Sequence, residues 1–202
     1  GETRVAKLPA EAWAAAVVGF DDTPPMNPGE ISIGFDVSPG GQWSSIAVGV
    51  GPLSRPYVEL IDHRPETGWL PKRIAELALR WRPTAIGFDQ AGPAGALADV
   101  VRTELRMAGA DVERLQPLTS QQYRAACGAF HLDVVEGRLR RAEAQTPLDE
   151  AGADATERRV GDGWVWDRRT ETSIAPLVAA TVARSLVAGG APPLDPWFGF
   201  SS

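Results

Sequence analysis

The tetrapeptide Ile-Gly-Phe-Asp occurs twice in this chain, at residues 33–36 and 86–89, and each copy closes a short apolar run. Before Asp36, apolar residues alternate with small or polar ones from Ile31 onward, a period typical of a strand with one apolar face. The run that ends at Asp89 follows a segment with helical spacing, so this second strand is expected to lie parallel to the first. Parallel strands end at the same edge of a sheet, where open α/β sheets bind ligands. Both carboxylates are therefore expected at that edge.

The remaining pattern predicts an α/β fold with a central mixed sheet flanked by helices. Two further alternating runs, Ile46–Val50 and Tyr57–Ile61, follow short turns and complete three antiparallel strands. The expected order then continues with a helix over 71–82, the strand over 85–89, a helix over 94–108, a strand over 112–118, a helix from 119 or 120 to about 135, a short strand over 164–166 and a last helix from Pro176. This order, three antiparallel strands followed by helices and parallel strands, resembles that of the ribonuclease H-like fold.

The chain is predicted to divide near residue 30. Pro24, Pro25 and Pro28 fix the backbone angle φ and remove hydrogen-bond donors. A short surface helix is expected upstream of them, between Leu8 and Val18. Because the sequence begins with Gly1 rather than Met, we expect a piece of a longer protein. The predicted division is a connector over residues 1–29, a compact domain over 30–190 and a tail over 191–202.

Composition excludes several classes of protein. No apolar run approaches the roughly 18 residues that span a bilayer, and the start of the chain lacks the pattern of a secretory signal. The single Cys127 excludes an internal disulfide and a cysteine-based zinc site, so a cytoplasmic protein is expected. The net charge of −6 argues against a uniformly basic nucleic-acid-binding surface. A local basic patch could still bind phosphate groups, because binding depends on the charge near the site and not on the net charge of the chain.

The paired carboxylates predict a divalent metal site. Two carboxylates held close together disfavour each other's ionised form unless a cation lies between them. Mg²⁺ prefers oxygen ligands and usually keeps several waters, and Mn²⁺ is the alternative. Two such ions, roughly 4 Å apart, can clamp the attacking and leaving oxygens of a phosphodiester displacement, with a metal-bound water as nucleophile. His63 and His131 stand in no evident acid–base arrangement. Taken singly, Asp36 and Asp89 can each also be read as a solvated turn residue.

A third acid is expected near the last helix. Glu171 precedes the helix that Pro176 opens, and Asp167 and Asp162 are weaker candidates. A carboxylate at this place also favours the positive end of a helix dipole. Metal ligation and simple helix capping by Glu171 are therefore both open.

Three segments resemble the C-terminal nuclease domain of the large terminase subunit of tailed phages, of the type found in phages of actinobacteria. They are Gly-Phe-Asp-Val-Ser at 34–38, Gly-Phe-Asp-Gln-Ala-Gly-Pro at 87–93, and Trp-Val-Trp-Asp-Arg-Arg at 164–169 leading into Ile-Ala-Pro-Leu-Val-Ala-Ala-Thr at 174–181. The likeness extends from about Ile31 to Val187.

This resemblance implies that Asp36 and Asp89 are ligands of Mg²⁺ or Mn²⁺, with two ions in the site. It implies an endonuclease that cuts concatemeric double-stranded DNA during genome packaging in the host cytoplasm, with the portal and the small terminase subunit as partners of the full-length protein. In that family an Asp usually precedes the Ile-x-Pro-Leu-Val segment, and here Ser173 stands there. Ser173 is therefore a weaker metal candidate than a carboxylate, with substitution by Glu171 or a weakened site as the alternatives. The sequence contains no P-loop, so we expect the packaging ATPase of that family to lie outside these 202 residues.

Clustered arginines are the candidates for DNA contact, because guanidinium groups bind phosphates without regard to base sequence. Many acids are interleaved with them, so a self-compensating surface loop is the alternative for any single pair. Gln121, Gln122 and Tyr123, at the start of the third predicted helix, could also approach a strand, and a helix start with one half-buried tyrosine is the alternative. The arginine candidates are Arg138, Arg140, Arg141, Arg158, Arg159, Arg168 and Arg169.

Three functional hypotheses follow. The first is a terminase nuclease, the second is another ribonuclease H-like enzyme such as a resolvase or an integrase, and the third is a catalytically weakened relative that only binds DNA or a packaging partner. The structure of residues 138–163 discriminates the first two: a hairpin over the site favours the terminase, and a basic dimer face favours the resolvase.

Overall fold

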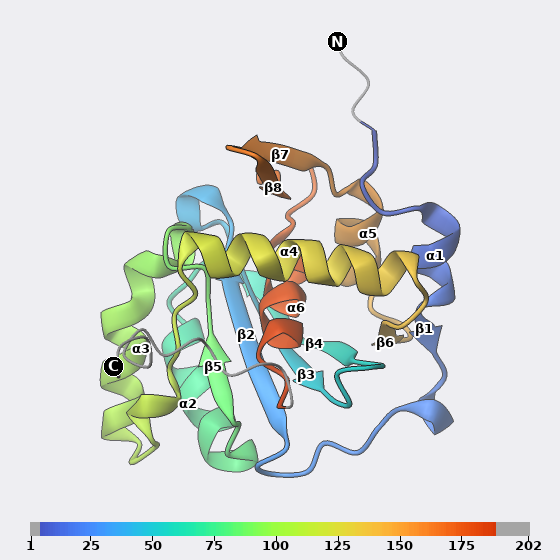
Figure 1. Cartoon of the computed structure of the whole chain (residues 1–202). Helices are drawn as coiled ribbons and strands as arrows, with labels where there is room; N and C mark the ends of the chain where they lie inside the picture. Colours follow the sequence, from blue (N-terminus) through green and yellow to red (C-terminus); the bar gives the residue numbers. More distant parts are fainter. Residues whose placement is uncertain (1–4, 189–202) are drawn as a thin grey trace, which may run out of the picture.

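A six-stranded mixed sheet forms the centre of the computed structural model, which describes residues 5–188 (Figure 1). The strands lie in the order β1-β6-β4-β3-β2-β5. β2, β3 and β4 pair antiparallel, whereas β5 pairs parallel to β2, β6 parallel to β4 and β1 parallel to β6. Their bounds are β1 Val17–Val18, β2 Ile31–Val37, β3 Trp43–Val50, β4 Tyr57–Pro65, β5 Ala85–Gly87 and β6 Arg140–Ala142.

Helices cover both faces of this sheet. On one face, α2 (Leu70–Trp81) and α3 (Ala98–Met107) enclose one hydrophobic cluster. On the other face, α6 (Ala175–Ser185) lies across β2 and β3, and α4 (Ser120–Val135), α1 (Ala10–Ala15) and α5 (Thr146–Asp154) pack around it in a second cluster (Figure 1). The predicted α/β fold with a mixed sheet, three antiparallel strands first and parallel strands after, is confirmed.

Short elements complete the chain. β7 (Glu157–Val160) and β8 (Gly163–Trp166) form a separate antiparallel hairpin. The short 3₁₀ segments within residues 5–188 are η1 (Phe20–Asp22), η2 (Pro39–Gly41), η3 (Pro93–Leu97) and η4 (Val112–Arg114). No helix within residues 5–188 combines the length and apolarity that a membrane crossing requires.

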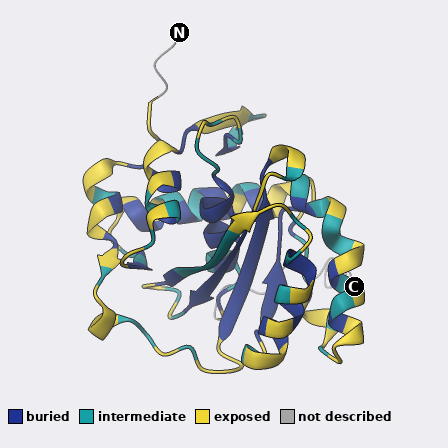
Figure 2. Cartoon of the chain, turned by 180° about the vertical axis from the view of Figure 1, so that it is seen from behind, coloured by how far each residue is buried: buried dark blue, intermediate teal, exposed yellow. Residues whose placement is uncertain are grey.

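The alternation in β2 divides its side chains between the two faces. Ile31, Ile33 and Phe35 join the cluster under α2 and α3. Ser32 and Gly34 face α6 instead: the Ser32 hydroxyl donates a 2.5 Å hydrogen bond to the Ala183 carbonyl oxygen. A side chain at Gly34 would overlap the backbone of α6. These small residues let the helix lie directly on the strand, and Figure 2 shows the central strands buried throughout.

The segment before residue 30, predicted as a connector, is partly packed into the domain. Leu8 and Trp13 are buried in the cluster around α6, and Val17–Val18 form the edge strand β1 beside β6. The packed part of the chain therefore begins upstream of the boundary predicted at residue 30. The tail predicted over 191–202 lies outside the described residues.

The strand predicted over 112–118 is only partly correct. Its first residues form η4, because the side chain of Asp111 accepts a hydrogen bond from the backbone N–H of Glu113 and closes a turn. Beyond the turn, Leu115 and Leu118 make single parallel bridges with Ile86 and Asp89. This short pairing still extends the edge of the sheet beside β5.

We expect Gly34→Ala to destabilise the protein by about 3 kcal/mol or more, because the added methyl group meets helix backbone that cannot move away. Gly128→Ala is the matched control: Gly128 lies inside α4 with open space around it, so alanine should raise the free energy of unfolding by about 0.5–1 kcal/mol. Urea unfolding of both variants measures the difference. Equal stabilities would contradict the close contact between α6 and β2.

Candidate active site

Asp36 and Asp89 converge at one edge of the sheet. Asp36 lies near the end of β2 and is fully buried, while Asp89 follows β5 and is 5% exposed. The two strands are parallel neighbours, and stacking of Phe35 on Phe88, with ring centroids 4.9 Å apart, holds the preceding residues together. The sequence-based expectation that both carboxylates stand at the same edge agrees with this geometry.

One guanidinium group bridges the two carboxylates. Nη1 of Arg168 donates a 2.6 Å hydrogen bond to Oδ2 of Asp36, and Nη2 donates a 3.0 Å bond to Oδ1. The same Nη2 atom also donates a 3.3 Å bond to Oδ2 of Asp89. Because both aspartates bond to one nitrogen atom, their carboxylates lie within two hydrogen-bond lengths of each other. Gly92 permits this approach, since a side chain there would press on Asp89 and Arg168.

Burial and charge oppose each other in this cluster. Burial raises the pKa of the Asp36 carboxyl above its usual value, the charge of Asp89 raises it further, and Arg168 acts in the lowering direction. Burial lowers the pKa of the Arg168 guanidinium, but attraction to Asp36 and Asp89 outweighs it and the net shift is upward. The guanidinium is therefore a permanent cation that offsets part of the negative charge.

The donor set suits a divalent cation with few protein ligands. Oδ1 of Asp89 is buried and has no hydrogen-bond partner among the described residues. Buried polar atoms are rarely left unpaired. Mg²⁺ is commonly bound by only one or two carboxylates and completes its shell with water. The two aspartates can therefore hold one such ion if Arg168 keeps only some of its hydrogen bonds to them or moves away.

The third acid predicted from sequence is not part of this cluster. Within residues 5–188, no group of three or more acidic, histidine or cysteine side chains is arranged to hold a metal ion. Glu171 is exposed and lines a cavity of about 190 Å³ that Arg168 also lines. Asp162 lies exposed in the turn between β7 and β8. The side chain of Asp167 accepts a hydrogen bond from the backbone N–H of Arg169, 3.0 Å away.

Ser173, which stands where the resembling family has an acid, has a local structural role. Its hydroxyl oxygen accepts a 3.3 Å hydrogen bond from the backbone N–H of Ala175, the first residue of α6. It also lines the same cavity as Glu171. Ser173 therefore shares a cavity with Arg168 but supplies no carboxylate to it.

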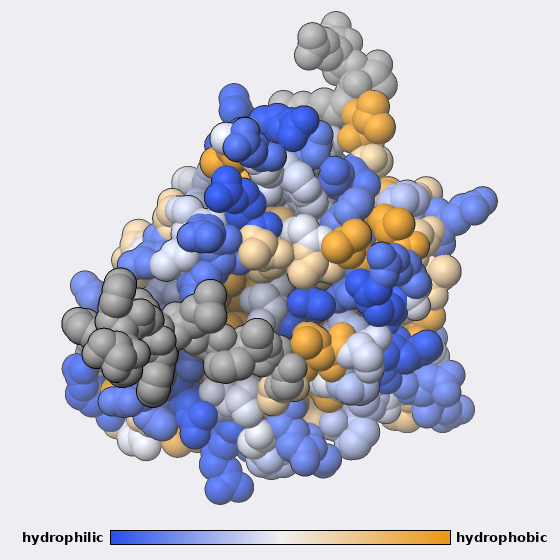
Figure 3. All heavy atoms as spheres, in the orientation of Figure 1, coloured by the Kyte–Doolittle hydropathy of each residue, from blue (hydrophilic) through white to orange (hydrophobic). Residues whose placement is uncertain are grey.

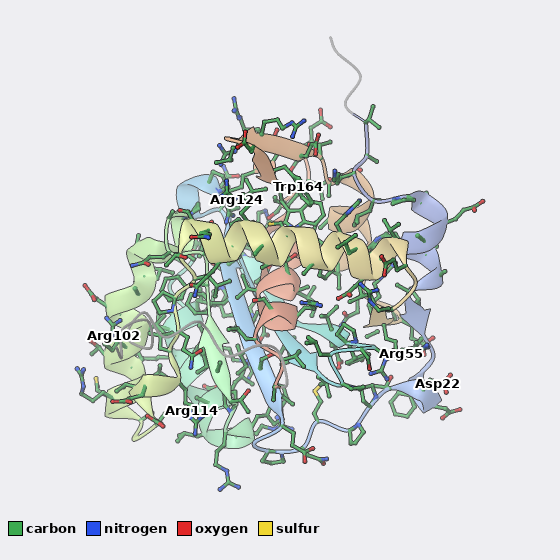
Figure 4. All side chains as sticks on the ribbon, in the orientation of Figure 1. Asp22, Arg55, Arg102, Arg114, Arg124 and Trp164 are labelled. Atoms are coloured by element: carbon green, nitrogen blue, oxygen red, sulfur yellow. The ribbon has the colours of Figure 1, made fainter. Side chains whose placement is uncertain are left out.

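The arginines of the first predicted DNA-binding group are occupied elsewhere. Arg138 forms ion pairs with Asp133 and Glu136, and Arg140 donates to the carbonyl oxygens of Arg55 and Gly51. In Figure 4, Arg55 lies well away from Arg124 and Trp164, which mark α4 and the hairpin.

Arg141 is only 2% exposed. It donates to the carbonyl oxygen of Trp13, stacks on the Trp13 ring and pairs with Asp149. Its burial contradicts the prediction of a DNA contact; this side chain instead fastens α1 and α5 to the sheet edge.

The second arginine group has two different environments. Arg158 lines a cavity of about 290 Å³ beside Asp89 and Arg168, whereas Arg159 lies on the other face of the hairpin, opposite Trp164. The side chain of Arg169 is 79% exposed. Of the seven predicted arginines, the structure brings Arg158 and Arg168 to the carboxylates.

Arg124 lines the same cavity, and sequence reasoning missed it. It donates a 3.3 Å hydrogen bond to the carbonyl oxygen of Val160 and so connects α4 to the hairpin. One signal was available in the sequence. Residues four apart lie on the same face of a helix, so Arg124 was expected on the face of Ser120, at the helix start that was already considered for strand contact.

The fold of this chain is similar to that of phage large terminases. It superposes on the large terminase of bacteriophage HK97 with a TM-score of 0.67 at 14% identity, covering 90% of this chain and 43% of that one. The large terminase nuclease of the thermophilic phage G20c gives 0.63 at 12% identity, covering 91% and 98%. The same G20c nuclease with bound magnesium gives 0.60 at 12%, covering 92% and 98%.

These values establish the nuclease-domain fold and confirm the resemblance at that level. The chain spans less than half of the HK97 protein and nearly all of the isolated G20c domain. No protein-family model and no curated protein matches the sequence.

We expect Arg168→Ala to lower the free energy of unfolding by about 3–5 kcal/mol in the absence of added divalent ions, because two buried carboxylates lose their counter-charge. Urea unfolding in EDTA measures the change. Arg169→Ala removes an adjacent but exposed charge and should change stability by less than about 0.5 kcal/mol. If the two variants are equally stable, Arg168 does not balance the buried acids.

Proposed function

We propose that this chain is the nuclease domain of a phage large terminase and cleaves double-stranded DNA with the help of divalent metal ions. The observation that carries the proposal is the convergence of Asp36 and Asp89 on one guanidinium group at the carboxyl edge of parallel strands. Structural neighbours with the same fold include nuclease domains with bound magnesium and manganese. We infer that the substrate is concatemeric DNA during genome packaging in the host cytoplasm, with the portal and the small terminase subunit as partners of the longer protein.

Asp36 and Asp89 would hold Mg²⁺ or Mn²⁺ through their carboxylate oxygens. When bound, such an ion supplies a water-derived nucleophile near neutral pH and neutralises charge on the phosphate. Asp89 offers its unpartnered Oδ1 for this purpose. Full burial of Asp36 excludes bulk water from that carboxylate and fixes its orientation. Arg168, once it releases one carboxylate, would be within reach of a phosphate oxygen at the same place.

The β7–β8 hairpin favours this function over a resolvase or an integrase. Residues 157–166 form a hairpin whose Arg158 and Val160 line the cavity beside Asp89. A hairpin next to the carboxylates is expected of a terminase nuclease, whereas a basic dimer face is expected of a resolvase.

A two-ion reaction needs a third carboxylate, and we propose Glu171 for it. Glu171 and Arg168 line one cavity, and Arg168 also bonds to both aspartates. Its side chain is exposed just before α6, so it can change rotamer at little cost.

Nicking of supercoiled plasmid with Mn²⁺ tests the proposed function. We expect Asp36→Asn and Asp89→Asn to reduce the nicking rate by about a hundredfold or more, because each removes a carboxylate from the ion. Asp99→Asn, on the exposed face of α3, is the control and should nick like wild type. Circular dichroism confirms folding of each variant. Undiminished nicking by Asp36→Asn would exclude this site as the catalytic centre.

Glu171→Gln should reduce nicking about tenfold or more if the glutamate completes a two-ion site. Glu150→Gln, an exposed position on α5, provides the matched change. The rates are compared over a titration of Mn²⁺, since loss of a ligand should also raise the metal concentration required. Identical titration curves for both variants would show that Glu171 is not a metal ligand.

A further inference from the structure

A cavity of about 290 Å³ lies next to Asp89, enclosed by the start of α4, the loop that contains Gly92 and the β7–β8 hairpin. Three arginines line it, Arg124, Arg158 and Arg168. Asp89 is the one acid among its described lining residues, and it already bonds to Arg168. The cavity therefore has a net positive lining although the whole chain is acidic. Figure 3 shows hydrophilic residues gathered over the hairpin, at the top of the view.

The amino terminus of α4 adds to this positive character. α4 has 16 residues, and its capping box uses the Thr119 hydroxyl to accept from the backbone N–H of Gln122. Ser120 and Gln121 line the cavity, and their backbone N–H groups take no part in the capping box. The first N–H groups of a long helix, together with its dipole, favour an anion at this end.

A buried hydroxyl group independently indicates a ligand. Tyr123 also lines the cavity and is 4% exposed; its phenol oxygen has no nitrogen or oxygen partner among the described residues, and the weakly bonding Cys127 thiol lies beside it. A buried hydroxyl without a partner is costly. An acceptor oxygen in the cavity would satisfy this donor.

The hairpin directs its two adjacent arginines differently. Arg158 is paired across the hairpin with Val165, and both line the cavity. Arg159 is paired with Trp164 on the opposite face, where Lys7 and Glu157 form a salt bridge. Successive side chains of a strand alternate between faces, so the two residues carry the same charge within one strand but not the same surroundings.

We propose that this cavity binds a phosphate group of the DNA strand next to the phosphate that lies at Asp36 and Asp89. The contacts are the guanidinium groups of Arg158 and Arg124, the N–H groups at the start of α4 and the Tyr123 hydroxyl. The inference rests on the proposed function and deepens it, because it states on which side of the acidic pair the cut strand continues. It requires no divalent ion.

The test is binding of a fluorescently labelled DNA duplex in EDTA, measured by anisotropy over a range of salt concentrations. We expect Arg158→Gln to weaken binding about three- to tenfold and to reduce the slope of log K against log salt concentration by about one. Arg159→Gln is the matched control, one residue away on the other face, and should stay within about twofold of wild type. Equal effects of the two substitutions, or none at Arg158, would overturn the phosphate site.

A second measurement uses inorganic phosphate as a competitor. In wild type, phosphate should displace the duplex more strongly than chloride at equal ionic strength, and Arg158→Gln should remove that difference. Equal displacement by both salts in wild type would mean that the cavity does not recognise a phosphate oxyanion.

The two proposals fail in distinguishable ways. If Asp36→Asn abolishes nicking but Arg158→Gln binds DNA like wild type, the nuclease stands and the phosphate site is wrong. If wild type does not nick but Arg158 and Arg159 still differ in DNA binding, the phosphate site stands and the nuclease is wrong.

Discussion

The direct contact between α6 and the sheet is the constraint on which the rest of the structure depends. Gly34 and Gly49 leave no room for a side chain between the strands and the backbone of α6, and Ser32 binds the helix by a hydrogen bond. The helix can approach this closely because most of its inward residues are alanine or valine. A short loop then leads from the hairpin to the helix, and this loop contains Arg168. Asp36 lies two residues beyond Gly34 on β2. The close packing of α6 at Gly34 therefore also helps to place Arg168 over Asp36.

Charge balance stabilises the two buried carboxylates of this site. Two carboxylates in a buried site repel each other, and the pKa of Asp36 is raised in consequence of its burial and of this neighbour. Arg168 supplies a rigid planar donor that fits a carboxylate with two parallel hydrogen bonds. The same fit makes the guanidinium a competitor for any cation that uses these oxygens. Substitution of Arg168 would therefore free the carboxylate oxygens for a cation and, at the same time, remove the positive charge that stabilises them.

The sequence predicted the parts of the fold that depend on local patterns. Alternation from Ile31 and the repeated tetrapeptide placed Asp36 and Asp89 at one edge, because strand direction and period fix where a side chain points. The residues that differ from prediction depend on tertiary contacts. Nothing local shows that Arg141 lies buried against Trp13, or that Arg168 turns inward while Arg169 stays exposed. Residues 112–118 form a 3₁₀ turn and two isolated bridges instead of the predicted strand, and the hydrogen bond to the Asp111 side chain that closes the turn is not visible in the hydrophobic pattern.

The two aspartates stand on paired backbone rather than on free loops. Asp36 pairs with Ser45 within the ladder of β2 and β3, and Asp89 bridges to Leu118. Their main chain was ordered when the sheet formed, so a ligand that arrives later meets groups with little conformational entropy left to lose. Glu171 is itself exposed and its side chain keeps that freedom. A ligand held by the two aspartates should accordingly lose less affinity to ordering of the protein than one that also has to fix an exposed side chain.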